Sequence, residues 1–347
     1  MKKLLYIIIY IPLLLLSACD IHQWPDAPAT VKLHLKLEYE TAMTEWIHTY
    51  KDSKVTEQGI GITYDNAIDY GRMRYIIRAY PINSKQQVSQ YYTQEFVLSK
   101  DVENGYNHSA NLDIVPGEYK IMVWSDFASN GSDYYYDPEN FGEIMLCGEY
   151  SGNSDYRDAF RGTNDITLVS DIMERLPDTL NIVMQRPLAK YSFITSDLKE
   201  FINKEVEYWT RVAATRGDVI PTRVNTDEYK VFLYFSGYMP SAYNMNIDAP
   251  VDAKMGVLYK SKLNVMSENE AELGFDYVFV NNNKSAVTVQ LVIYDKEDRQ
   301  LALSSPINIP LKRSHHTILK GSFLMEQASG GIKINPEFDG NHNIVIE

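Results

Sequence analysis

Cysteine is nearly absent from this chain of 347 residues, which contains only Cys19 and Cys147. So few thiols exclude a cysteine-rich zinc site. If Cys19 carries a lipid, no internal disulfide can form, and hydrophobic cores must hold the fold together. Cys147 lies in the apolar segment Gly142–Gly148, which favours a strand with a packed thiol over a reactive one.

Sequence motifs of catalysis are lacking too. The chain has no Gly-x-Ser-x-Gly, no phosphate-binding glycine loop and no His-Glu-x-x-His. The neighbours His315 and His316 would point to opposite faces of a strand and could not easily share one metal ion. The segment Asp133–Asn140 mixes carboxylates with tyrosines and could bind calcium or sugar, but a surface loop is the simpler interpretation. We therefore expect no enzyme, no cofactor and no metal site.

Basic residues are fewer than acidic ones. The chain has 33 Lys and Arg and 46 Asp and Glu, which gives a formal net charge of -13. Such a surface disfavours binding of nucleic acid. Hydrophobic residues make up 45% of the chain and charged residues 23%, which predicts folded domains with sizeable cores. The 26 tyrosines suit half-buried sheet surfaces, and only a cluster on one exposed face would indicate stacking on sugars.

The N-terminus has the pattern of a secretory signal. Lys2 and Lys3 precede an apolar stretch, Leu4–Leu16, which is too short to span a bilayer comfortably. Small residues then lead to a cysteine, in a sequence that looks like the lipobox of bacterial lipoproteins: Leu16, Ser17, Ala18 and Cys19. We expect cleavage before Cys19 and transfer of a diacylglyceryl group, which carries fatty acids such as palmitate, to its thiol. Two or more acyl chains would hold the protein on a membrane without spanning it.

The mature chain reads as a series of short strands. Val31–Tyr39 alternates strictly between apolar and polar residues, which predicts a strand with one buried and one solvent-exposed face. Similar predicted strands follow as far as Met184, and a second group of predicted strands begins after the segment Arg186–Lys190. One good helix, with Ser196 as its expected cap, carries Leu198, Phe201, Ile202, Val206 and Trp209 close to one face.

This pattern predicts an all-β protein of two antiparallel β-sandwich domains with at least one short helix. We expect residues 1–18 to be the signal peptide and residues 19–30, which include Pro25 and Pro28, to be a tether. The two sandwiches would then occupy residues 31–185 and 186–347.

Several segments together resemble the lipidated minor or anchor subunits of the fimbrillin superfamily, which builds type V pili. The segments, in chain order, are Val115–Tyr119 with Val123–Asp126, Tyr156–Gly162, Arg186–Lys190, Tyr234–Pro240 with Tyr243 and Asn244, Ile309–Arg313 with Thr317, Gly321 and Leu324, and Gly330–Gly340. The resemblance implies two transthyretin-like sandwiches and assembly with other fimbrial subunits by strand exchange. It also implies a lipid-anchored position at the outer membrane, on the cell surface, and leaves room for a host or bacterial surface ligand.

One departure from that family is informative. Polymerising fimbrillins are thought to lose their first strand by cleavage after an arginine, but this chain has no arginine before Arg72. An uncut first strand suits an anchor better than a repeating stalk subunit, although an unrelated surface lipoprotein would also keep it.

The C-terminal segment is a candidate donor strand for β-augmentation of a partner. It contains Asn343, Ile344, Val345 and Ile346, but an ordinary edge strand of the second sandwich explains the same pattern. The competing function is a surface glycan-binding lipoprotein, which exposed coplanar aromatic rings in a shallow groove would favour. A swappable strand without such a platform would favour the fimbrial anchor.

Overall fold

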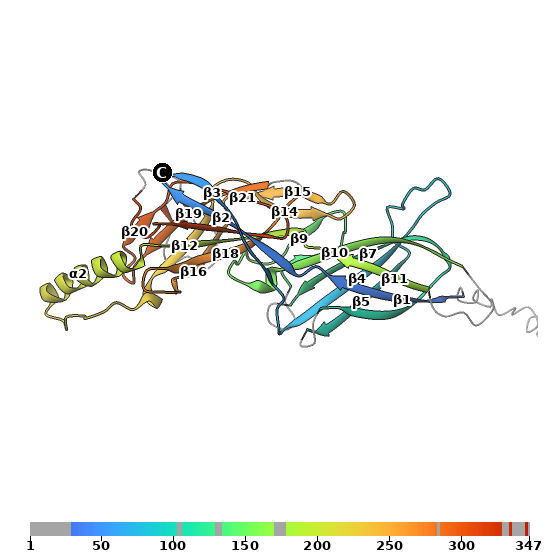
Figure 1. The fold of residues 1–347 in the computed structure, drawn as a ribbon, viewed down its shortest axis with the longest axis horizontal. Coiled ribbons are helices and arrows are strands. Elements are labelled where there is room, and N and C mark those ends of the chain that lie inside the picture. Colours follow the sequence, from blue (N-terminus) through green and yellow to red (C-terminus); the bar gives the residue numbers. More distant parts are fainter. Residues whose placement is uncertain are drawn as a thin grey trace, which may run out of the picture.

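The computed structural model describes residues 29–102, 106–128, 134–169, 178–282 and 285–327, and two short strands beyond them. Figure 1 shows an elongated molecule made of β-sheets, with β1 (Val31–Tyr39) toward one end and the helix α2 (Leu198–Arg216) at the opposite end. The prediction of an all-β chain with two sandwiches and a helix is confirmed.

The first sandwich packs a three-stranded sheet, in the order β11-β1-β6, on a four-stranded sheet, in the order β10-β7-β4-β5. The remaining bounds are β4 Arg72–Pro81, β5 Gln94–Asp101, β6 His108–Ile114, β7 Gly117–Phe127, β10 Ala159–Leu168 and β11 Asp178–Met184. The predicted alternation of β1 holds, because Leu33, Leu35 and Leu37 are buried in the core between the sheets. β1 is the central strand of its sheet and pairs parallel with β11 and antiparallel with β6.

The second sandwich packs a six-stranded sheet, β17-β18-β12-β22-β2-β3, on a sheet of β16, β13, β19, β20 and β21. Its strands are β2 Ala42–Lys51, β3 Lys54–Asp65, β12 Leu188–Thr195, β13 Lys230–Phe235, β16 Leu258–Lys262, β17 Asn264–Val265, β18 Ala271–Phe279, β19 Ser285–Tyr294, β20 Gln300–Leu303, β21 Ile307–Leu311 and β22 His315–Gly321. β22 pairs parallel with both β2 and β12, so the sheet is mixed and departs from the expected antiparallel arrangement.

The hairpin β2–β3 belongs to the second sandwich although it directly follows β1 in sequence. Asp52 and Ser53 both have positive φ, which is the backbone of a two-residue hairpin turn. The predicted domain boundary at residue 186 is therefore wrong for this hairpin. Residues 42–65 lie within the predicted first domain, but they form two strands of the sheet that contains β12.

A small third sheet covers part of the first sandwich. It has the order β15-β14-β9-β8, with bounds Ala249–Lys254, Met239–Asn244, Ile144–Leu146 and Tyr136–Asp137. Its residues Tyr136, Phe141 and Ile144 pack with Ile76 and Trp124 from the outer face of the four-stranded sheet. The outer face of β4 is therefore largely buried, including Arg78.

The helix α2 is longer than expected and differs from the prediction at its start. Asp197, and not Ser196, is the N-cap residue, while the Ser196 hydroxyl donates to the carbonyl of Gly321. Leu198, Phe201 and Trp209 are buried as expected, but Glu205 takes the buried place expected for Val206. The helix ends at Gly217, whose left-handed conformation favours glycine.

Candidate functional site

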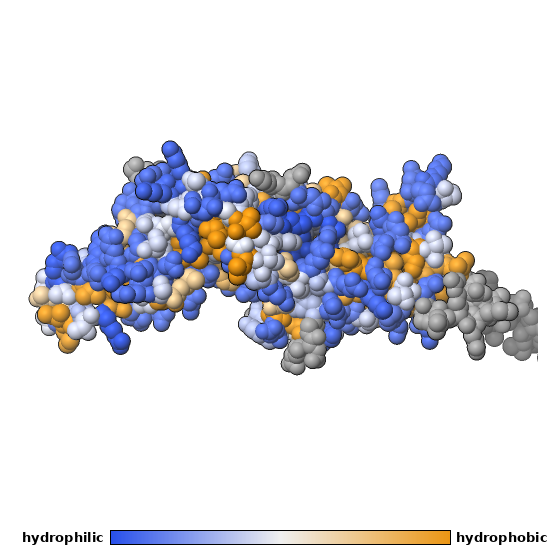
Figure 2. All heavy atoms as spheres, viewed as in Figure 1, coloured by the Kyte–Doolittle hydropathy of each residue, from blue (hydrophilic) through white to orange (hydrophobic). Residues whose placement is uncertain are grey.

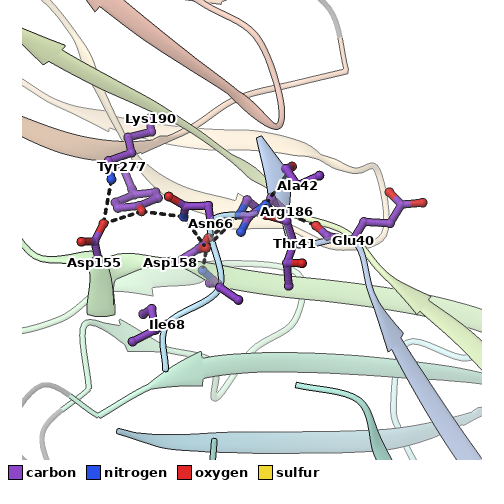
Figure 3. A network of polar contacts seen from close by, with 12 residues as sticks. Glu40, Thr41, Ala42, Asn66, Ile68, Asp155, Asp158, Arg186, Lys190 and Tyr277 are labelled. Carbon is purple, nitrogen blue, oxygen red and sulfur yellow. Dashed lines mark hydrogen bonds and ion pairs between the residues drawn. The ribbon is translucent and has the colours of Figure 1, made fainter. Parts of the chain in front are cut away.

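A network of buried ion pairs joins the two sandwiches. A short turn of 3-10 helix, η1 (Asp155–Arg157), lies just before β10. Together with its C-cap residue Asp158, it provides most of the charged side chains that the first half of the chain gives to this network. Asp158 accepts two hydrogen bonds from Nε of Arg186, at 2.9 and 2.8 Å, and both side chains are fully buried (Figure 3). Arg157 faces Asp276 of β18 at 2.8 Å in a second buried pair. Pairs of this kind are costly to break, because each leaves an uncompensated charge.

Arg186 also holds the connection between β1 and β2. Its Nη1 donates to the backbone carbonyls of Glu40, Thr41 and Ala42, at 3.2, 2.7 and 3.2 Å (Figure 3). Only two residues separate the strands, and the backbone N–H of Glu40 donates to Met184. The backbone carbonyls between the first strand and the rest of the chain are therefore hydrogen-bonded to the junction, although the side chains of Glu40 and Ala42 are exposed.

A second branch of the network reaches β12 and β18. Lys190 Nζ lies 2.7 Å from Asp155, and the hydroxyl of Tyr277 donates to the same carboxylate at 2.8 Å. Asn66 donates to the Tyr277 hydroxyl at 3.0 Å (Figure 3). Burial alone would lower the pKa of Arg157, but the charge of Asp276 and the neighbouring tyrosines together outweigh burial and raise it, so the guanidinium stays charged. The junction therefore places buried residues of opposite charge against one another.

The two neighbouring histidines have separate environments, as expected. The ring of His316 bonds to Ser192 and to Tyr64, both at 2.9 Å, while Nδ1 of His315 lies 2.8 Å from the carbonyl of Arg313. Burial, aided by the charge of Lys190, lowers the pKa of His316 to about 3, so this ring is neutral. Within the described ranges, no group of three or more His, Cys, Asp or Glu could hold a metal ion.

Cys147 follows β9 and is only partly buried. Its Sγ lies 2.7 Å from the carbonyl of Tyr134, and burial raises the pKa of the thiol. A raised pKa disfavours the reactive thiolate, in agreement with the expected structural role.

The strand β3 is the exposed edge of the six-stranded sheet. It is twelve residues long and pairs with β2; β21 comes near it, but no ladder joins the two in the described part of the chain. Ile60 and Ile62 are 60% and 65% exposed, and Figure 2 shows a hydrophobic patch where β2 and β3 lie in Figure 1. A long apolar edge of this kind can accept a strand from another chain.

The sequence-predicted site residues fall at the two ends of the chain. Leu16, Ser17, Ala18 and Cys19 lie outside the described residues, and so do Asn343 and Ile346. Ile344 and Val345 form β24 (Ile344–Val345), which pairs antiparallel with β23 (Lys333–Ile334). Among the described strands, this pair makes a sheet of its own and is not part of the second sandwich.

The tyrosines divide into two groups. One group is buried or half-buried, as strand propensity predicts, and the other is exposed and includes Tyr91, 79% exposed, and Tyr92, 42% exposed, on the loop between β4 and β5. Tyr91 and Tyr92 line one groove, so the structure brings two exposed tyrosines to one place on the surface.

No helix in the described ranges is both long and apolar enough to cross a bilayer. α2 has the length, but charged side chains interrupt it throughout.

Comparisons with known proteins give one family and several distant structural similarities. A family model with the description "Family of unknown function (DUF6562)" matches residues 27–347. No curated protein matches. The fimbrial anchor protein Mfa2 of Porphyromonas gingivalis is similar with a TM-score of 0.37 and 9% identity, over 79% of this chain and 82% of that chain.

Two further solved structures come from Bacteroides. A candidate polysaccharide-binding protein of Bacteroides thetaiotaomicron has a TM-score of 0.40 and 10% identity, with 79% of each chain covered. A candidate adhesin of Bacteroides ovatus has a TM-score of 0.38 and 10% identity, over 83% of this chain and 80% of that chain.

Proposed function

The chain belongs to the family described as DUF6562, and we propose that it is a lipid-anchored surface protein, the anchor or a minor subunit of a fimbria. In this role the protein binds other fimbrial subunits by strand addition and carries out no catalytic step. The observation that carries the proposal is the open edge of β3, with Ile60 and Ile62 exposed on it. The motifs at Cys19 and along the mature chain supply the membrane attachment and the fimbrial context.

The elongated shape supports attachment at one end. β1 is the first described strand and lies toward the end of the molecule farthest from α2 (Figure 1). A lipid on Cys19, twelve residues before Val31, would tether that end to the outer membrane. The second sandwich, with β3 and α2, would then face away from the membrane, where a pilus subunit could reach it.

Cys19→Ala should release the protein from membranes. The thiol of Cys19 is the only one near the expected cleavage site, and without it no diacylglyceryl group can be attached. Cells that express the variant are fractionated after labelling with a fatty acid, and Cys147→Ala serves as the control with the same loss of a thiol. Membrane-bound, labelled Cys19→Ala would contradict the lipid anchor.

The edge of β3 offers both parts of a strand-binding site. An edge strand has unpaired N–H and C=O groups on its outer side, which give affinity, while side chains spaced by two residues give specificity. Ile60 and Ile62 have this spacing. Register shifts near Trp46 and His48 show that bulges interrupt the β2–β3 ladder, so the acceptor edge is twisted. The partner that fits is an extended segment with alternating apolar residues, such as the donor strand of another fimbrillin.

The double variant Ile60→Lys, Ile62→Lys tests this proposal. Both side chains are mostly exposed, so the fold should survive, whereas two lysines on the edge should reduce co-purification with fimbriae at least tenfold. Val219→Lys with Ile220→Lys is the matched control, because these side chains are 93% and 56% exposed on the loop after α2. Normal co-purification of the folded β3 variant would rule out this edge as the acceptor.

A further inference from the structure

A groove lies on the first sandwich, between the β4–β5 loop and the turn that joins β8 to β9. Its volume is about 710 Å³, within the usual range of ligand pockets, roughly 300–1,000 Å³. We call it the tyrosine groove and define it by Tyr80, Tyr91, Tyr92, Asp137, Glu139 and Glu143. A second hollow of about 600 Å³ continues from it and shares Tyr80, Gln90 and Asn140. A ligand several units long could follow both.

The exposed ring of Tyr91 stands on a backbone that is already fixed. The hydroxyl of Ser89 accepts a hydrogen bond from the N–H of Tyr91 at 3.0 Å and lies 2.8 Å from its carbonyl. The loop is tied to β4 through Ser89 N–H to Pro81 and Thr93 N–H to Ala79. A ligand that stacks on Tyr91 therefore orders little protein, and less of its binding energy is lost to entropy.

The charges of the groove disfavour an anionic ligand, and the aromatic faces of Tyr92 and Phe141 are already occupied. The guanidinium of Arg78 lies between the rings of Tyr92 and Phe141, 4.6 and 4.2 Å from their centres, and is paired with Glu95 at 2.6 Å. The aromatic site that could hold a cation is thus already filled by the protein's own arginine. Asp137, Glu139 and Glu143 repel an anion at the same end.

The remaining chemistry suits a polyhydroxylated, uncharged ring. An exposed tyrosine offers a flat apolar face, and carboxylates accept hydrogen bonds from hydroxyl groups. Amides from Gln90, Asn140 and Asn246 extend along the second hollow and can both donate and accept. We propose that the tyrosine groove binds a neutral oligosaccharide, with one sugar stacked on Tyr91 and its hydroxyls bound by the carboxylates of the β8–β9 turn.

The test uses the full mature protein in detergent and an array of neutral hexasaccharides: cellohexaose, laminarihexaose, mannohexaose, xylohexaose and maltohexaose. Hexagalacturonate is the acidic comparison, and a lysine-rich peptide is the cationic one. We expect saturable binding of at least one neutral hexasaccharide and none of the two charged probes. Tyr91→Ala should weaken that binding at least tenfold, and Glu139→Gln with Glu143→Gln should weaken it as well.

Tyr238→Ala is the matched control, because Tyr238 is 69% exposed and does not line the groove. It should bind the sugar as the unmodified protein does, and thermal unfolding should be equal in all variants. Failure of all five neutral hexasaccharides to bind would overturn the proposal. So would sugar binding that survives Tyr91→Ala, or preferential binding of a charged probe. Co-purification with fimbriae is measured separately, since the groove and β3 lie on different sandwiches.

Discussion

Asp158→Asn should lower the free energy of unfolding by about 3–5 kcal/mol, because it leaves the buried guanidinium of Arg186 without a counter-charge. Asparagine keeps the shape of the side chain, so the loss reports charge and not a cavity. Urea unfolding of the mature protein measures it, with the two sandwiches followed by separate probes. We expect the effect in both, since the pair joins β10 to the start of β12.

The chain offers a matched control on its surface. Arg216 and Glu297 form a similar two-bond pair, at 2.6 and 3.0 Å, with side chains about half exposed. Glu297→Gln should leave the free energy of unfolding unchanged within error, because water solvates the released arginine. A loss for Asp158→Asn as small as that for Glu297→Gln would show that the junction is not sealed from water.

A double-mutant cycle separates the pair from the rest of the network. In a background of Arg186→Met, Asp158 has lost the positive charge to which it is directly hydrogen-bonded, so Asp158→Asn should then cost much less than it does alone. Arg186→Met itself should remain costly, because the carbonyls of Glu40, Thr41 and Ala42 lose their donor. Additive effects would mean that Asp158 and Arg186 do not act as a pair.

Regular alternation made part of this fold predictable. β1 was predicted from its leucines, and β12 begins at Leu188, within two residues of the end of the segment after which new strands were expected. The hairpin β2–β3 was missed because two bulges break the period-two pattern: Met43, Trp46, His48 and Tyr50 are the buried residues of β2. Gly59 and Gly61 also make β3 difficult to predict, since glycine is unfavourable inside strands.

The ion pairs of the junction could not be predicted from local patterns in the sequence. Asp158, Arg186 and Asp276 are far apart in sequence, and only the fold brings their charges together. Two of the segments that resemble fimbrillins, Tyr156–Gly162 and Arg186–Lys190, contribute four residues of the network, which gives a physical reason for their residue types. These residues are Arg157, Asp158, Arg186 and Lys190. The burial of Ile76 and Arg78 on β4 depends on a distant segment in the same way, because the segment that contains Phe141 packs with both.

Deleting β1, Val31–Tyr39, should abolish folding of the first sandwich. The strand carries Leu33, Leu35 and Leu37, which are at most 2% exposed. Losing a buried leucine costs about 2–5 kcal/mol, so three would remove roughly 6–15 kcal/mol, comparable to the whole stability of a domain, about 5–15 kcal/mol. The deletion also leaves β6 and β11 unpaired along the edges that faced β1. Circular dichroism and limited proteolysis of the deletion variant measure the loss.

The control deletion, Trp24–Ala27, removes part of the expected tether and should leave thermal unfolding unchanged. A synthetic peptide of residues 30–40, added to the β1 deletion during refolding, should restore the protection of the first sandwich from proteolysis. The peptide would bind between β6 and β11, in the slot that β1 normally fills, and its pairing with both strands would fix its register. Folding of the β1 deletion without this peptide would contradict the central role of the strand.

The same site between β6 and β11 bears on the fimbrial role that we propose. If β1 stays in place, it occupies the site between β6 and β11, and a donor strand has no access there. The connection after β1 is two residues long and bonded to buried Arg186, so a protease cannot draw it into an extended conformation without opening the junction. We therefore expect mass spectrometry of protein isolated from cells to find residues 31–39 still joined to residue 42 and beyond. A subunit closed at this slot could end a chain of strand exchanges but could not pass it on, which fits an anchor. Recovery of a form that begins after Tyr39 would instead indicate an open slot and a polymerising subunit.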